Sequence, residues 1–229
     1  MPGVTQVIFG ATQLLPEDVK GSKVLDVGAC DFNGSIGPLI QAWKPSEYLG
    51  VDIIAGPGVD VVCSADDLVA RFGPDRFDIV LCIEMLEHTP NWRRSIQNMK
   101  EVLKPGGIFL ATTRSLGYPC HGFPNDYWRY EKEDLARIFA DFQISTLIKD
   151  PGDPGIFIKA IKPEIWRPIS TNEICLYCVM TGDRVPELPE DYKKQNYFRR
   201  LATKQRLKEA FHRFVLACGR IVTKILKVG

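Results

Sequence analysis

Residues 23–35 read KVLDVGACDFNGS, in which a short apolar run ends at a glycine and passes into a small polar loop. The run predicts a buried strand, and Ser35 is the expected N-cap of the helix that follows, with Pro38 in the first turn of that helix. A ligand at this loop would meet exposed backbone N–H groups and a helix N-terminus, which suit a carboxylate or a phosphate. The stretch therefore predicts the ligand-binding end of a strand–loop–helix unit.

Short β-branched runs alternate with amphipathic stretches from residue 23 to about residue 161, which predicts an α/β fold. We expect a doubly wound, mostly parallel seven-stranded sheet. Its strands are expected at residues 23–27, 47–51, 59–63, 77–83, 107–112, 142–149 and 156–161, and the clearest helix at residues 91–103. The sequence KPGG at 104–107 should stop that helix. DPGDPG at 150–155 predicts a turn, which makes the last two strands an antiparallel hairpin.

An acid follows the second expected strand. Asp52 ends the stretch YLGVD, about 20 residues after the first loop, and a carboxylate there can accept both hydroxyls of a ribose. The ligand is therefore expected to contain a nucleoside. A dinucleotide loop requires GxGxxG, but Cys30 stands two residues after Gly28, which disfavours NAD. The alternative is that Gly28, Gly34 and Asp52 serve only turns.

The first loop resembles that of the class I S-adenosylmethionine-dependent methyltransferases, in which DxGxGxG follows the first strand. Asp26 and Gly28 match the start of this motif. Cys30 and Phe32 replace its next two glycines, and Gly34 is expected to supply the turn. The resemblance implies a Rossmann-like fold and S-adenosylmethionine as the cofactor.

This resemblance continues in order along residues 23–161. CSADDL at 63–68 stands where the family holds adenine through an acidic side chain and a backbone N–H. Because Ser64 replaces that acid, Ala65 and Asp66 are the candidates for the adenine contact. FDIVLCIEMLEH at 77–88 resembles the fourth strand and ExLEH loop common in small-molecule methyltransferases, and LKPGG at 103–107 matches the turn before their fifth strand. The candidate cofactor-binding residues are Asp26, Gly28, Cys30, Gly34, Asp52, Ala65, Asp66 and Glu84.

The methyl acceptor is expected beyond the fourth and fifth strands, at residues 84–92 and 113–130. The second segment contains YPCHGFPNDYWRY, a loop long enough to serve as a lid. Methyl transfer to a hydroxyl is faster when a base removes the hydroxyl proton. Two of the three histidines in the chain, His88 and His121, lie in these segments and titrate near neutrality. Either histidine could take the proton, and Glu84 and Asp126 are the next candidates, for orienting the acceptor or the imidazole. The candidate catalytic residues are His88, His121 and Asp126.

Structural roles are the alternative for each of these residues. His88 would brace the following helix, and His121 and Asp126 would tie the loop to the sheet. The aromatic side chains would form either a hydrophobic plug or a surface that stacks on a sugar or an aromatic acceptor. These aromatic residues are Tyr127, Trp128 and Tyr130.

The expected function is transfer of a methyl group to a small or medium-sized acceptor, with a hydroxyl of a sugar or glycan preferred, including one presented on a lipid. The similarity of FPNDYWRY at 123–130 to methyltransferases associated with surface polysaccharides favours the sugar. No NPPY-like sequence follows the fourth strand, which disfavours amino-nitrogen methylation of nucleobases. An RNA methyltransferase and a non-catalytic nucleoside-binding module are the alternatives.

The composition, 45% apolar and 25% charged, is that of an ordinary globular protein and excludes disordered, collagen-like and disulfide-framework classes. Seven scattered cysteines favour a reducing compartment, so a cytoplasmic location is expected, with peripheral membrane contact as a variant of it. Neither an export signal nor a membrane span is expected. Cys175 and Cys178 lie three apart in an expected strand at 174–180 and face opposite ways, so no metal site is expected.

Charge is unevenly distributed, because residues 193–229 carry eleven Lys and Arg and one acid, which gives +10 and leaves −9 for residues 1–192. From about residue 198 this tail has helical periodicity. Its apolar stripe consists of Leu207, Phe211, Phe214, Cys218, Ile221, Ile225 and Val228. The stripe is expected to dock on this domain or a second copy, to lie in an anionic membrane interface, or to assist polyanion binding, with nucleic acid least favoured. The expected divisions are a cofactor-binding domain (1–165), a connector with an extra strand (166–192) and the tail (193–229).

Overall fold

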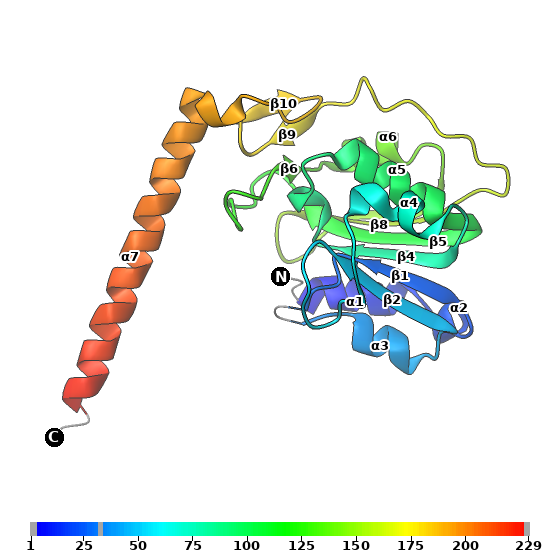
Figure 1. Ribbon diagram of the computed structural model, residues 1–229, viewed down its shortest axis with the longest axis horizontal. Coiled ribbons are helices and arrows are strands. Elements are labelled where there is room, and N and C mark those ends of the chain that lie inside the picture. Colours follow the sequence, from blue (N-terminus) through cyan, green and yellow to red (C-terminus); the bar gives the residue numbers. More distant parts are fainter. Residues whose placement is uncertain (1–3, 32–33, 227–229) are drawn as a thin grey trace.

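The computed structural model describes residues 4–31 and 34–226, and of residues 217–226 it describes the backbone only (Figure 1). Its centre is a seven-stranded sheet with the order β3-β2-β1-β4-β5-β8-β7. The strands are β1 (Lys23–Val27), β2 (Glu47–Asp52), β3 (Val61–Val62), β4 (Phe77–Ile83), β5 (Leu103–Arg114), β7 (Gln143–Lys149) and β8 (Gly155–Ile161). Strands β1 to β5 pair in parallel, whereas β8 is antiparallel to β5 and β7. The expected doubly wound, mostly parallel sheet is confirmed.

Both faces of the sheet are buried, because successive strand residues point to opposite sides and helices cover each side (Figure 1). Leu25 and Val80 pack in the cluster that includes residues of α4, α5 and α6. Val24 and Leu81 pack in a second cluster with residues of α1, α2 and α3. The helices are α1 (Val4–Gln13), α2 (Pro16–Val19), α3 (Gly37–Ala42), α4 (Leu68–Phe72), α5 (Trp92–Val102) and α6 (Lys132–Ile138).

Three local details differ from the expectation. Helix α3 begins at Gly37 with Ile36 in the N-cap position, and the hydroxyl of Ser35 accepts a hydrogen bond from the Gly37 N–H at 2.9 Å instead of capping the helix itself. Strand β3 is shorter than expected, since the preceding residues form a turn closed by the Val59 N–H on the Gly56 carbonyl. Strand β5 begins at Leu103, so the KPGG sequence is part of this strand, whose pairing with β4 shifts register at its start.

A small second sheet joins the connector to the main domain. Strands β6 (Trp128–Arg129), β9 (Leu176–Cys178) and β10 (Asp183–Val185) pair antiparallel in the order β10-β9-β6. The extra strand of the connector is thus shorter than the expected 174–180. Leu176 and Cys178 are buried in the larger hydrophobic cluster, whereas Cys175 is partly exposed.

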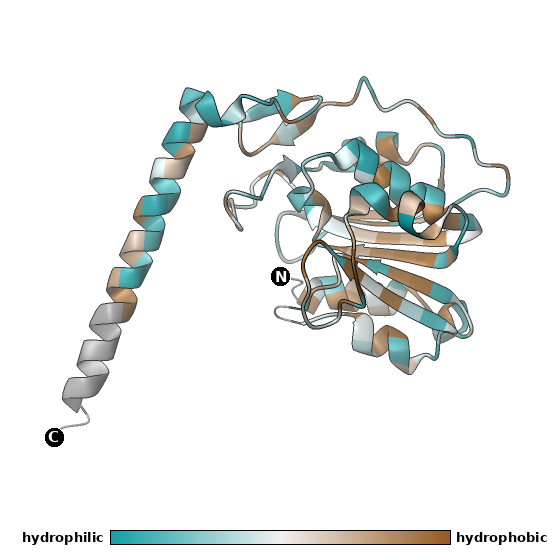
Figure 2. Ribbon diagram, in the orientation of Figure 1, coloured by the Kyte–Doolittle hydropathy of each residue, from teal (hydrophilic) through white to brown (hydrophobic). Residues whose placement is uncertain are grey.

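Helix α7 (Asn196–Leu226) extends away from the domain after the short turn η3 (Tyr192–Lys194) (Figure 1). Its first turns are attached to the domain through Phe198, whose ring stacks on Phe123 at 5.6 Å. Further along, apolar and polar residues alternate on its surface (Figure 2), and Leu207, Phe211 and Phe214 are 65–69% exposed. The expectation that the stripe docks on its own domain is therefore wrong for these three residues. The side chains of Cys218, Ile221 and Ile225, and all of Val228, lie outside the described residues.

Within residues 4–31 and 34–226, no helix combines the length and the apolar character needed to cross a membrane.

Candidate active site

The carboxyl ends of β1, β2 and β4 surround a cavity of about 650 Å³. Its volume falls in the range of small-molecule sites, and its place matches the ligand position in open α/β sheets. Eight of the eleven candidate residues line it: Gly28, Cys30, Asp52, Ala65, Asp66, Glu84, His88 and His121. The remaining three, which are Asp26, Gly34 and Asp126, lie outside the lining.

Gly28 carries the chain from β1 into the cavity wall. Its φ angle is 85°, a left-handed conformation that favours glycine, and its N–H donates to the Val51 carbonyl at 2.8 Å. A Cβ at this position would lie 2.6 Å from Cγ of Met85. Glycine is therefore required both by the backbone conformation and by the close packing of the loop after β4.

Asp52 stands at the end of β2 on the opposite side of the same loop. Its Oδ2 accepts a hydrogen bond from the Cys30 N–H at 3.3 Å, and its Oδ1 accepts one from the Ile54 N–H at 3.2 Å. These bonds fix the carboxylate at the cavity wall, where lone pairs remain for a ligand.

Asp26 supports this region from below. Its side chain is buried and accepts a hydrogen bond from the Tyr48 hydroxyl at 2.6 Å. Burial raises the pKa of Asp26 to about 6, against the opposing effect of the Tyr48 hydrogen bond. Gly34 forms a turn in which its N–H donates to Oδ1 of Asp31 at 2.7 Å, and Phe32 lies outside the described residues. The direct cofactor contacts expected of Asp26 and Gly34 thus gain no support from the geometry.

The turn η1 (Ala65–Asp67) forms the side wall next to β3. The backbone N–H of Asp66 donates to the Ser64 hydroxyl at 3.2 Å, and the Asp66 carboxylate accepts a hydrogen bond from the Ser95 hydroxyl of α5. Asp66 is therefore held in place by two serines, and its N–H is already engaged.

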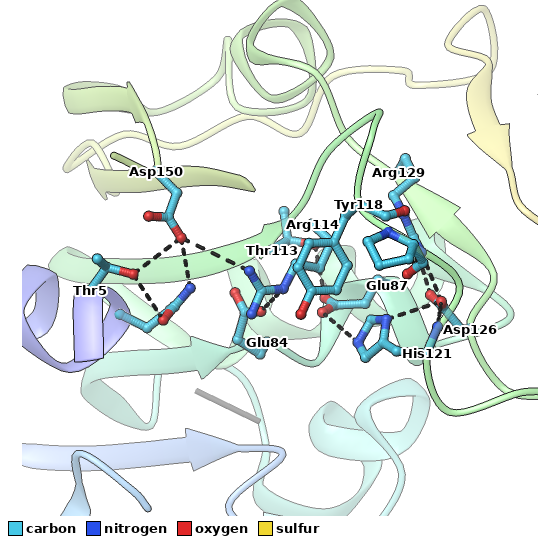
Figure 3. Close-up of polar contacts among 12 residues, drawn as sticks. Thr5, Glu84, Glu87, Thr113, Arg114, Tyr118, His121, Asp126, Arg129 and Asp150 are labelled. Carbon is cyan, nitrogen blue, oxygen red and sulfur yellow. Dashed lines mark hydrogen bonds and ion pairs between the residues drawn. The ribbon is translucent and has the colours of Figure 1, made fainter. Parts of the chain in front are cut away.

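Glu84 follows β4 with a φ angle of 55°, which is unusual for a residue with a side chain and costs of order 1 kcal/mol or more. Its buried carboxylate forms an ion pair with Arg114, which also lies 3.9 Å from the Asp150 carboxylate (Figure 3). Burial and the neighbouring Glu87 carboxylate raise the pKa of Glu84 to about 8, although Arg114 opposes this shift. Several buried acids thus share one guanidinium beneath the cavity.

The loop after β5 is attached firmly to the turn η2 (Leu86–His88). The Tyr127 N–H donates to the Glu87 carbonyl at 2.8 Å, and the Trp128 indole N–H donates to the Thr89 carbonyl at 2.9 Å. Tyr127, Trp128 and Tyr130 are at most 8% exposed and belong to the larger hydrophobic cluster. These aromatic residues therefore form the hydrophobic plug, and the expectation that they present a stacking surface is wrong.

The two histidines come together from different loops, with ring centroids 4.8 Å apart. Nδ1 of His88 lies 2.6 Å from the Asn125 carbonyl oxygen, and Nδ1 of His121 lies 3.0 Å from Oδ2 of Asp126. Because a carbonyl oxygen only accepts, Nδ1 of His88 carries the proton and Nε2 has a free lone pair. Neither ring nitrogen of His121 makes a hydrogen bond within the described residues.

Asp126 lies behind His121 and is fully buried. The Arg129 guanidinium donates to both of its carboxylate oxygens, at 2.6 and 2.7 Å. The backbone N–H of His121 donates to Oδ2 at 2.7 Å. Burial alone would raise the pKa of Asp126, but Arg129 and His121 hold it well below its usual range. Asp126 therefore holds the backbone of His121 in place, and the orienting role expected of it from the sequence stays a prediction.

Comparison with known proteins agrees with this geometry. A family model described as a methyltransferase domain matches residues 6–149. The chain belongs to the class I S-adenosylmethionine-dependent methyltransferases. S-adenosylmethionine is accordingly its cofactor, as the resemblance of the first loop implied.

Curated relatives of this methyltransferase are named ubiquinone biosynthesis O-methyltransferase. The one from Pseudomonas entomophila is 34% identical over 170 residues, which cover 68% of this chain and 66% of that protein. The one from Idiomarina loihiensis is 34% identical over 123 residues, which cover 48% of this chain and 49% of that protein. The chain spans about half to two thirds of the length of these relatives.

A solved structure of similar fold is the 1,6-didemethyltoxoflavin-N1-methyltransferase of Burkholderia thailandensis, with bound 1,6-didemethyltoxoflavin and S-adenosylhomocysteine. Its TM-score is 0.55 at 20% identity, and the match covers 69% of this chain and 76% of that one. This likeness supports the fold.

Two buried residues of the methyltransferase site were not predicted from the sequence. Glu87 is fully buried, and its Oε2 accepts a hydrogen bond from the Thr113 hydroxyl at 2.9 Å. Arg114 is 3% exposed at the end of β5. The available signals were the position of Glu87 beside His88 in the ExLEH stretch and an arginine directly after an apolar strand.

Proposed function

We propose that this methyltransferase transfers the methyl group of S-adenosylmethionine to a hydroxyl group of a small or medium-sized acceptor. The observation that carries the proposal is that one cavity is lined both by the β1 loop with Asp52 and by the imidazoles of His88 and His121. Strand β1 separates β2 from β4 in the sheet. Asp52, at the end of β2, and His88, after β4, therefore lie at different ends of the cavity.

The donor end suits an adenosyl sulfonium compound. Asp52 would bind the ribose hydroxyls, while the loop at Gly28 and Cys30 lets a ligand approach the backbone closely. Ala65 would lie beside the adenine, with Asp66 at its edge. Asp26 and Gly34 would act as supports of the loop.

Glu84 would bind the ammonium group of the methionine part. Both of its carboxylate oxygens are buried without a hydrogen-bond partner among the described residues, apart from the ion pair with Arg114. A buried acceptor of this kind is costly unless a donor meets it, and a cationic ligand supplies one.

At the acceptor end the chain supplies positioned imidazoles. When bound, S-adenosylmethionine provides an electrophilic methyl group, so the protein has mainly to align the acceptor oxygen and remove its proton. Nε2 of His88 and Nε2 of His121 are the candidate proton acceptors. The Asn125 carbonyl holds the ring of His88 in that orientation, and the Asp126 carboxylate lies 3.0 Å from Nδ1 of His121.

The oxygen acceptor is supported by the relatives named O-methyltransferases. A sugar or glycan hydroxyl is the acceptor that the FPNDYWRY stretch favours, but Tyr127, Trp128 and Tyr130 of this stretch are buried and provide no stacking surface. A phenolic hydroxyl is the second candidate, because the relatives' names point to quinone synthesis.

The test is methyl transfer from labelled S-adenosylmethionine by the purified full chain to a panel of glycans, phenols and RNA. We expect label on a hydroxyl, and at least a tenfold loss of rate in His88→Ala and His121→Ala. His212→Ala is the matched control, since His212 is exposed on α7. Tight cofactor binding without transfer to any acceptor would favour the nucleoside-binding module, and label on RNA would favour the RNA methyltransferase.

We further propose that α7 contacts an anionic membrane surface, which suits an acceptor presented on a lipid. Phe211 and Phe214 are exposed on a helix that also carries many basic residues, and this combination is typical of interfacial helices. Phe211→Ser/Phe214→Ser should lose co-sedimentation with phosphatidylglycerol vesicles, while Thr203→Ser should retain it. Loss of a dimer in the double variant, with no vesicle binding in either protein, would show that the helix meets a second copy instead.

A further inference from the structure

One carboxylate and two imidazoles converge at the acceptor end of the cavity. Glu87, His88 and His121 each offer one ligand atom, and these atoms lie within 4.8 Å of one another. Figure 3 shows Glu87 and His121 facing each other from separate loops, with Oε1 of Glu87 3.9 Å from Nε2 of His121. We propose that these three residues bind a divalent first-row transition-metal ion such as Zn²⁺.

His88 is already oriented as a metal ligand usually is. In known metal sites, the ring nitrogen that does not bind the ion donates to a carbonyl or carboxylate, which fixes the tautomer. Nδ1 of His88 has the Asn125 carbonyl oxygen at 2.6 Å, and Nδ1 of His121 has the Asp126 carboxylate at 3.0 Å. This leaves Nε2 of His88 with the lone pair that a metal ion requires, and neither ring nitrogen of His121 has a hydrogen-bond partner within the described residues.

Glu87 provides the anionic ligand. Its Oε2 is held by the Thr113 hydroxyl, whereas its Oε1 is buried with no hydrogen-bond partner among the described residues. Leaving a buried carboxylate oxygen without a partner is costly, and a bound cation removes that cost. The unpartnered atom is the one that faces His121.

Neighbouring positive charges do not neutralise Glu87. Arg114 forms its ion pair with Glu84, and Arg129 forms its ion pair with Asp126. Within the part of the chain that the structure describes, no Lys or Arg nitrogen lies within 4.0 Å of the Glu87 carboxylate. A cation in this place would therefore complete the charge balance.

The ligand types indicate the kind of metal. Two imidazoles and one carboxylate suit Zn²⁺ and other divalent transition metals, whereas Mg²⁺ and Ca²⁺ favour oxygen ligands. At Zn–N and Zn–O distances of about 2.1 Å, ligand atoms lie about 3.4 Å apart, so separations of up to 4.8 Å must close by at most about 1.4 Å. Three protein ligands and one open position are typical of a catalytic zinc ion.

This inference deepens the proposed function and rests on it for its role in the reaction. Because His88 and His121 line the cavity, an ion held by them would lie at its wall, where an acceptor hydroxyl would bind the ion and be held against the methyl donor. His88 and His121 would then serve as ligands. The ion would lower the pKa of the bound hydroxyl, so that its proton passes to solvent water while the oxygen takes the methyl group and S-adenosylhomocysteine leaves with the electron pair of the broken S–C bond.

The test is metal binding by the full chain after treatment with EDTA, followed by calorimetry with Zn²⁺ and by visible absorption with Co²⁺. We expect one ion per chain, and at least tenfold weaker binding in Glu87→Gln, His88→Ala and His121→Ala. His212→Ala should bind as the wild type does, because this exposed histidine on α7 lies outside the cluster. Circular dichroism will establish that each variant is folded.

Three outcomes would overturn the proposal: no binding by the folded chain, equal binding by all the variants, or thiolate charge-transfer bands in the Co²⁺ spectrum, which would assign the ion to cysteines. The proposed function fails separately. Metal binding at the three residues without methyl transfer to any hydroxyl would contradict only the acceptor assignment, whereas full activity of the metal-free chain would contradict only the role of the ion.

Discussion

The backbone N–H of Cys30 donates a hydrogen bond to Oδ2 of Asp52 at 3.3 Å. This bond joins the loop after β1 to the end of β2, so the two parts of the proposed cofactor site hold each other in place. The carboxylate keeps lone pairs for a ligand, because a carboxylate can accept about four hydrogen bonds.

Replacing Asp52 should directly weaken the binding of the methyl donor. We expect Asp52→Ala to reduce S-adenosylmethionine affinity by about 1 to 3 kcal/mol, through lost hydrogen bonds to the ribose, as measured by isothermal titration calorimetry. Asp67→Ala is the matched control, since Asp67 is exposed and lies outside the cavity lining. Equal affinity of Asp52→Ala and the wild type would contradict the ribose assignment.

Gly28→Ala tests the close approach of the loop to Met85. The new Cβ would lie 2.6 Å from Cγ and 2.7 Å from Cβ of Met85, so the loop must move and cofactor affinity should fall more than tenfold. Gly73→Ala separates this collision from backbone strain. Gly73 has a similar φ of 78° but no atom within 4 Å of a new Cβ, so its variant should lose about 1 kcal/mol of stability and keep its affinity. Equal affinity losses in both variants would contradict the steric argument.

The sequence predicts the donor half of the site well because its signals are local. The bounds expected for β1 and β4 agree with the structure, since both strands are apolar on two faces and end at charged or glycine residues. Asp52 and Gly28 follow directly from their strands. A parallel sheet then brings strand ends together at one edge, whatever the loops contain.

The acceptor half depends on contacts between distant loops, which no local pattern reveals. The role of Glu87 depends on His121, which arrives from the loop after β5. Trp128 and Tyr130 fit both a plug and a stacking surface in sequence, and only their burial distinguishes the two. Asp26 matched the family motif, but its side chain is buried and accepts a hydrogen bond from Tyr48, which lies 22 residues away in the sequence. This contact assigns Asp26 a supporting role below the loop.

Asp26 should make the stability of the fold depend on pH near neutrality. Its pKa is raised from 3.8 to about 6 in the folded state, mainly by burial. Its contribution to stability is therefore fully present below about pH 4 and is lost as pH rises through 6. Asp26→Asn removes this dependence. As the pH is raised from 4 to 8, the free energy of unfolding of the variant in urea should therefore rise by about 2 to 3 kcal/mol relative to that of the wild type. Parallel pH profiles of the two proteins would refute the shift.

Asp126 should give the opposite pH dependence. Because Arg129 and His121 hold its pKa below the ordinary value, its contribution to stability is present above about pH 4 and is lost as pH falls below that value. Asp126→Asn leaves the buried Arg129 guanidinium without its anion, which should cost about 3 to 5 kcal/mol at pH 7 by urea unfolding. The difference from the wild type should shrink as the pH is lowered below 4, since the wild-type carboxyl then becomes neutral as well.

Asp67→Asn provides the exposed counterpart of that change. Asp67 pairs with Arg94 at 3.0 Å, but the two side chains are 57% and 59% exposed, so solvent screens the pair. Its loss should cost less than about 1 kcal/mol and leave the acid profile unchanged. A loss in Asp126→Asn no greater than in Asp67→Asn would mean that the buried pair with Arg129 does not stabilise the loop, and His121 would then lack the fixed orientation on which both of its proposed roles depend.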